Sequence, residues 1–172
     1  MSGRRRFILW FAASLLAACA SLETPPVPAR VASYTLNVEP QAALAAALAV
    51  APGLGLKVKT PARVNNYVQF RRHGLSPEQL QSYCIYPGLH GQAPKQWQNF
   101  QSWSLDSVRD GMGPISGSIE LSLQVSANPG GGSKISTRST LEASTSARSF
   151  PCESTGVLES EFQNALGRQA GS

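Results

Sequence analysis

The chain has 172 residues, with 15 Lys and Arg against 10 Asp and Glu and a formal net charge of +5. Three of the basic residues stand together as Arg4-Arg5-Arg6, and taking them from the fifteen leaves twelve against the ten acidic ones. The remaining basic residues are dispersed and are not clustered with stacking aromatics, which argues against nucleic acid as a partner. The length suits one domain with a core of its own.

The N-terminus has the three-part order of a secretory signal peptide. The arginines precede an uncharged run from Phe7 to Leu16, which is too short for a permanent membrane span, and small residues then lead to Cys19. The stretch Leu16-Ala17-Ala18-Cys19 resembles the lipobox of bacterial lipoproteins, in which the Cys is acylated and becomes the mature N-terminus. We therefore expect a signal peptide over residues 1–18. An ordinary signal peptide with an incidental cysteine is the alternative.

The lipobox resemblance also implies a location. More than one acyl chain on Cys19 gives stable anchoring, so the membrane is an expected partner. In such lipoproteins an Asp after the Cys tends to retain the protein at the inner membrane, whereas here Ala20 and Ser21 follow. This implies the outer membrane of a Gram-negative cell, on its periplasmic side. The proline-rich range 19–33 is interpreted as an extended tether.

The first elements of the domain are a strand, a helix and two more strands. Apolar and polar residues alternate over 34–38, which predicts a half-buried strand. Pro40 opens an alanine-rich run to residue 51, which predicts a helix with Leu44 and Leu48 one turn apart. The alanine surface around these leucines indicates that the helix packs closely against another element. Two strands then follow, joined by a turn around 60–63.

Trp97, Phe100 and Trp103 stand at three-residue intervals after a stretch predicted to be a long loop, over 86–101. If exposed, these aromatics form a docking patch for a protein partner. If buried, they are the core beneath the loop, which is the interpretation that we favour. Before the loop, Ser76-Pro77-Glu78-Gln79 combines an N-cap, a proline at the first helical position and a capping Gln, which predicts a short helix.

The strongest pattern is an alternation of apolar and polar residues over 115–125, which resumes over 135–143. It predicts an antiparallel hairpin with its tip at 128–132. The three glycines of the tip lack the Lys-Ser/Thr of a phosphate-binding loop, so a flexible turn is favoured.

Two cysteines remain beside Cys19, and in an exported domain Cys84 and Cys152 are expected to form a disulfide. Two buried free thiols are the alternative. Cys152 stands just before a predicted C-terminal helix, which is capped by Ser154 or Thr155, carries the stripe Leu158, Phe162 and Leu166, and ends at Gly167.

The two histidines, His73 and His90, stand among loop-forming residues without a neighbouring metal-binding or catalytic pattern. No Gly-x-Ser-x-Gly motif occurs. The sequence thus predicts no catalytic residue, no metal site and no cofactor.

These elements predict an α+β domain over 34–168, followed by a flexible tail over 169–172. We expect a mainly antiparallel twisted sheet of about five or six strands, with two main helices packed on one face. The element order is similar to the helix-grip arrangement in a lipoprotein of the outer-membrane β-barrel assembly machine. That resemblance implies the fold alone.

The expected function is that of an outer-membrane-anchored periplasmic lipoprotein, not an enzyme, that serves as an accessory or scaffold subunit with an envelope protein as partner. A carrier of lipid or another apolar ligand is the first alternative, and it requires a cavity between helix and sheet. An envelope hydrolase is the second, and it requires His73 or His90 beside a Ser or a carboxylate.

Overall fold

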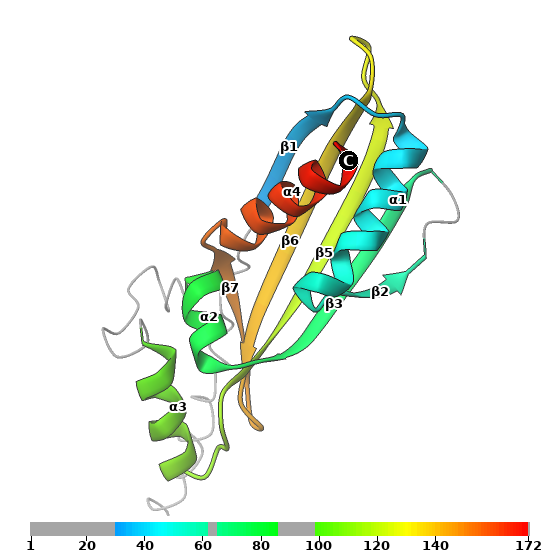
Figure 1. Ribbon diagram of the computed structural model, residues 1–172. Helices are drawn as coiled ribbons and strands as arrows, with labels where there is room; N and C mark the ends of the chain where they lie inside the picture. The colour runs from blue at the N-terminus through cyan, green and yellow to red at the C-terminus, as the bar shows by residue number, and fades with distance from the viewer. Residues whose placement is uncertain (1–29, 62–64, 86–98, 172) are drawn as a thin grey trace, which may run out of the picture.

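The computed structural model describes residues 30–61, 65–85 and 99–171 (Figure 1). The strands are β1 (Arg30–Leu36), β2 (Lys57–Thr60), β3 (Tyr67–Leu75), β4 (Cys84–Ile85), β5 (Ser116–Ala127), β6 (Ser133–Ser144) and β7 (Ser149–Ser154). The helices are α1 (Pro40–Val50), the short 3-10 helix η1 (Ala51–Leu54), α2 (Pro77–Tyr83), α3 (Phe100–Arg109) and α4 (Val157–Ala170).

All the strands join one antiparallel sheet in the order β2-β3-β5-β6-β7-β4, and β1 also pairs with β6. Two strands pair with the same edge of β6: β1 pairs with Ser133–Ser139 and β7 pairs with Leu141–Ser144. The predicted α+β class is therefore confirmed. The described sheet has seven strands, more than the five or six expected, because β4 and β7 were not predicted. Strand β7 contains Pro151, and proline is disfavoured within strands.

Helices α1 and α4 lie side by side across one face of the sheet (Figure 1). The predicted hairpin is confirmed as β5 and β6, and its apolar half faces these helices. The buried side chains of the hairpin are Ile119, Leu121, Leu123, Val125, Ser133, Ile135, Thr137, Ser139, Leu141 and Ala143. On α4 the predicted stripe is also buried, and the ring of Phe162 lies 6.0 Å from that of Phe70 on β3.

Helix α1 begins at Pro40 as predicted and ends at Val50, one residue before the predicted end. Ala43 and Ala47 are fully buried, whereas Leu44 is half-buried and Leu48 is 38% exposed. Small alanine side chains let the helix axis approach its neighbours closely, so the alanine face is the one that packs. The close packing expected from the alanine surface of this helix is confirmed.

Strand β1 starts at Arg30, so the range 30–33 belongs to the sheet and not to the predicted tether. Strand β6 supplies the ladder with which β1 pairs. At the other end of β1, a Cβ on Gly132 would clash with the carbonyl oxygen of Leu36. Gly132 has φ +74°, so the hairpin tip requires glycine where β1 leaves the sheet.

The remaining helices combine confirmed and missed predictions. In α2, Ser76 and Gln79 form the predicted capping box. Helix α3 was not predicted; its first turn is capped by the side-chain oxygen of Asn99, which accepts two backbone N–H groups at 3.1 Å each. Helix α4 passes the predicted end at Gly167, and its N-cap is Gly156. None of the helices in the described ranges is long and apolar enough to cross a membrane.

Candidate functional site

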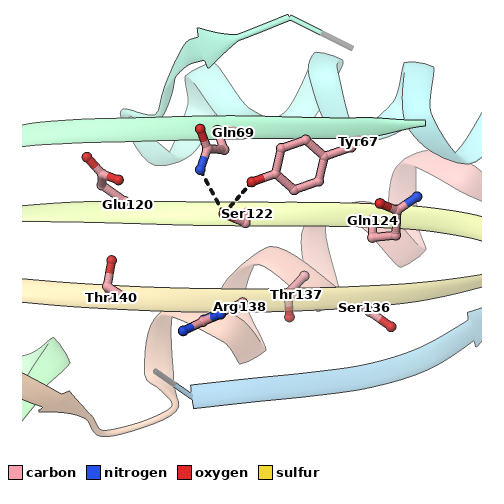
Figure 2. Close-up of a pocket in the computed structure, with 9 residues that line it drawn as sticks. All are labelled: Tyr67, Gln69, Glu120, Ser122, Gln124, Ser136, Thr137, Arg138 and Thr140. Carbon is pink, nitrogen blue, oxygen red and sulfur yellow. Dashed lines mark hydrogen bonds between the residues drawn. The ribbon is translucent and has the colours of Figure 1, made fainter. Parts of the chain in front are cut away.

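The face of the sheet opposite α1 and α4 is polar and carries a shallow groove of about 450 Å³. Figure 2 shows its lining on β3, β5 and β6, with the helices behind the strands. The lining residues are Tyr67, Gln69, Glu120, Ser122, Gln124, Ser136, Thr137, Arg138 and Thr140. Most of them belong to the polar half of the alternation whose apolar half is the core, because successive strand residues point to opposite faces.

The strand register arranges the lining in rows across the sheet. Ser122 on β5 is opposite Gln69 on one side and Arg138 on the other. In the next row, Gln124 lies between Tyr67 and Ser136. Each row thus joins side chains from three strands into one surface.

A chain of hydrogen bonds fixes the first row. The hydroxyl of Thr60 donates to Oε1 of Gln69 at 3.1 Å, and Nε2 of Gln69 donates to Oγ of Ser122 at 3.3 Å. The hydroxyls of Tyr67 and Ser122 share one further bond of 3.1 Å. Tyr67 donates its proton to Oγ of Ser122 in this bond, so the hydroxyl proton of Ser122 remains for another acceptor.

Arg138 is exposed and makes no hydrogen bond or ion pair with any described residue. Its guanidinium group carries five N–H donors and a permanent positive charge. Ser122 lies directly opposite across the β5–β6 ladder, as Figure 2 illustrates. The middle of the groove therefore presents an unsatisfied cation beside a free hydroxyl proton.

At one end of the groove, Lys59 and Arg71 share the carboxylate of Glu120. Lys59 Nζ lies 2.8 Å from Oε1 and Arg71 Nε 2.9 Å from the same oxygen. Hydrogen bonds from Lys59 and then from Arg71 lower the pKa of Glu120. Two cations on one carboxylate leave this end with an excess of positive charge.

Phe100 and Trp103, two of the three aromatic residues considered as an alternative docking patch, do not form one on the described surface. Phe100 is 1% exposed and Trp103 is 7% exposed. The ring of Trp103 lies 5.1 Å from that of Phe150 in an edge-to-face arrangement. These two side chains are part of the core, as the favoured interpretation held, while Trp97 lies outside the described residues.

Cys84 and Cys152 are paired as a disulfide, with their Cα atoms 5.5 Å apart. Cys84 is on β4 and Cys152 is on β7, so the bond lies beside the short β4–β7 ladder. Cys152 was expected at the entrance of the C-terminal helix, and the structure places a strand there first. Cys19 lies outside the described residues.

His73 is exposed on β3, opposite Ser118 on β5, and Ser118 also faces Glu142 across the next ladder. No hydrogen bond joins His73 to either of them. His90 lies outside the described residues. Within the described part of the chain, no group of three or more His, Cys, Asp or Glu could hold a metal ion.

A buried carboxylate on the helix side of the sheet was missed by the sequence reading. Glu159, in the first turn of α4, is 6% exposed. Ser154 on β7 donates to Oε2 at 2.8 Å, and Ser139 on β6 donates to Oε1. Glu159 thereby fixes α4 to two strands, and the partial positive charge of the helix N-terminus favours its carboxylate.

The chemistry of the groove suits binding better than proton transfer. Its carboxylate, Glu120, has a lowered pKa and two cationic partners, so it stays ionised and is a poor general acid. The groups in it that lack a partner among the described residues, including the guanidinium group of Arg138 and the hydroxyl proton of Ser122, are hydrogen-bond donors that can bind an acceptor. No family model, no curated protein and no solved structure matches this chain.

Proposed function

We propose that this chain is a lipid-anchored, non-enzymatic accessory or scaffold subunit of a bacterial envelope. Acyl chains on Cys19 would hold it at the periplasmic side of the outer membrane, and the groove would bind another envelope component. The observation that carries the proposal is the open polar groove, with the unpaired Arg138 at its centre.

Two features support the expected compartment. The lipobox resemblance at Leu16–Cys19 predicts export and acylation, and the Cys84–Cys152 disulfide suits an oxidising compartment outside the cytosol. Ten residues separate Cys19 from β1. In extended geometry, at about 3.1 Å per residue, they would let the domain stand roughly 30 Å from the membrane.

The two alternative functions have less support. A lipid carrier needs an apolar cavity between α4 and the sheet, where Leu158, Phe162 and Leu166 are fully buried and Phe162 meets Phe70. A hydrolase needs a histidine in contact with a Ser or a carboxylate, and His73 has no such hydrogen bond.

The anchoring part of the proposal is tested with Cys19→Ser. The wild-type chain should incorporate a radiolabelled fatty acid and fractionate with membranes, whereas the variant should lose both properties. The double variant Cys84→Ser/Cys152→Ser is a matched control, because it removes the other two cysteines, which form the disulfide, and should keep the label. A Cys19→Ser chain that still carries the label and stays in the membrane fraction would contradict the anchoring.

The binding part is tested by purifying the tagged full chain in mild detergent and identifying what accompanies it. Arg138→Gln should lose the accompanying component. Arg168→Gln removes the same charge from α4, on the other face, and should retain it. Equal recovery with both variants would contradict the groove as the binding site.

A further inference from the structure

The groove is lined in part by hydroxyl groups that lack hydrogen-bond partners among the described residues, and these indicate which kind of ligand it can bind. The hydroxyls of Ser136 and Thr140 have no partner among the described residues, and the pair Tyr67–Ser122 keeps one free hydroxyl proton. Hydroxyl groups both donate and accept hydrogen bonds. Sugar hydroxyls have the same dual character, so they can pair with this lining in either direction. The ring of Tyr67 adds an aromatic surface for the C–H face of a sugar (Figure 2).

The charge of the groove favours an anionic ligand. Lys59 and Arg71 are already bound to Glu120, whereas Arg138 has no anionic partner in the described part of the chain. A ligand carboxylate would give Arg138 two parallel charge-assisted hydrogen bonds. Phosphate or sulfate groups would pair with the guanidinium group in the same bidentate way, and a carboxylate is the anionic group that a sugar ring can carry without a further substituent.

The positions of the exposed apolar side chains on the described surface argue against a protein as the ligand of this groove. The exposed large apolar residues are Leu48, Val58, Ile85, Leu105, Val108 and Val157. None of them lines the groove. Stable protein interfaces centre on buried aromatic or aliphatic anchors, which this lining offers only in Tyr67. A hydroxyl-rich acidic chain therefore fits better than an acidic peptide.

We infer that the groove binds an acidic saccharide, a sugar chain that carries carboxylate groups. A carboxylate pairs with Arg138, and the sugar hydroxyls lie along Ser122, Ser136 and Thr140. The inference rests on the proposed function, since it names the ligand class of the same groove.

Binding occurs without cleavage of the chain. Most glycoside hydrolases use two carboxyl groups on either side of the scissile bond, and one of them must donate a proton. Among the described residues that line the groove, Glu120 has the only carboxyl group, and Lys59 and Arg71 keep it ionised.

The test uses the full chain in detergent and measures Kd by calorimetry for three probes. Oligogalacturonate carries both hydroxyls and carboxylates, dextran carries hydroxyls alone, and poly-L-glutamate carries carboxylates on a peptide. We expect oligogalacturonate to bind at least tenfold more tightly than either of the others. Its binding should weaken as salt is added, because the Arg138 pair is exposed to solvent.

Variants locate the binding within the groove. Arg138→Gln should weaken oligogalacturonate binding by tenfold or more, and Ser122→Ala should weaken it severalfold. Arg168→Gln on α4 should leave Kd unchanged. Circular dichroism of each variant separates a loss of binding from a loss of the fold.

Two kinds of result overturn the inference. One is poly-L-glutamate binding as tightly as oligogalacturonate, or no measurable binding of oligogalacturonate. The other is oligogalacturonate binding that persists in folded Arg138→Gln. If no saccharide binds but an envelope protein is captured in an Arg138-dependent way, the saccharide inference fails and the proposed function stands. If neither is captured, both fail.

Discussion

The hydroxyl of Ser154, on β7, donates a 2.8 Å hydrogen bond to the carboxylate of Glu159, in the first turn of α4. Both side chains are buried, and the second oxygen of Glu159 accepts from Ser139 on β6. One carboxylate thus joins the C-terminal helix to two strands. The helix side of the sheet is held by this contact as well as by apolar packing.

Replacing Glu159 with Ala should lower the free energy of unfolding by about 1–3 kcal/mol, because two buried hydroxyls lose their acceptor. Glu159→Gln retains one acceptor oxygen and should cost less. Urea unfolding followed by circular dichroism measures the difference. Glu153→Ala, at an exposed position on β7, should change little. Equal effects at the two positions would argue against a structural role for Glu159.

Removing the disulfide should destabilise the fold strongly. Cys84 and Cys152 are 68 residues apart, and releasing a loop of that length costs about 4 kcal/mol in the chain-entropy description. Urea unfolding of Cys84→Ser/Cys152→Ser, against the oxidised wild type, tests this. Cys19→Ser should unfold like the wild type. An unchanged midpoint in the double variant would mean that the bond contributes little to stability.

Gly117, on β5, leaves no room for a side chain. A Cβ there would overlap Cδ2 of Leu80 and lie 3.1 Å from Cβ of Leu75, and both leucines are buried. Gly117→Ala should therefore cost about 1–3 kcal/mol through overpacking. Gly53→Ala, where nothing lies within 4 Å of the added Cβ, is the matched control. Thermal melts that rank the two variants the other way would contradict the packing of α2 on β5.

The ion pairs of Glu120 predict a pH dependence of stability. Its pKa is lower in the folded chain than its ordinary value of 4.5, so the unfolded chain binds the proton more readily. The stabilisation is complete above the ordinary pKa and disappears as the pH falls through the lowered one. The side chains of Lys59 and Glu120 are 34% and 32% exposed, so the effect should not exceed about 1 kcal/mol.

Urea unfolding between pH 3 and pH 7 measures this term as the difference between the wild type and Glu120→Gln. The difference should be constant above about pH 5 and shrink at lower pH. A difference that grows as the pH falls would show that Glu120 is not stabilised by its cationic neighbours.

The sequence correctly predicted the elements in which one face is buried and the other is exposed, because such elements show a regular apolar–polar pattern. The alternation over 115–125 was predicted correctly because the apolar residues of this segment are buried on one side of the sheet. In α1 the sequence predicted the close packing of the helix but not which residues it buries most, which are Ala43 and Ala47 and not the larger leucines. Helix α3 was missed because its buried face mixes Phe100 and Trp103 with serines, which weakens the apolar periodicity.

The groove could be predicted only in part. Its residues were visible as the polar half of the alternating strands, but nothing in the sequence placed Arg138 beside Ser122 or brought Lys59 and Arg71 to one carboxylate. Those neighbours depend on the register of β2, β3, β5 and β6. Glu159 was equally hidden, because its burial depends on serines from two separate strands.

The central claim is that the groove holds an envelope component, and photo-crosslinking in intact cells of the native host tests it most directly. A diazirine-bearing residue would replace Ser136 in the groove or, in a control chain, the exposed Gln163 on α4. The account predicts a discrete adduct from position 136, lost when Arg138→Gln is added, and none from position 163. The claim would be contradicted by adducts from position 163 alone, or by an adduct from position 136 that is still formed when Arg138→Gln is present.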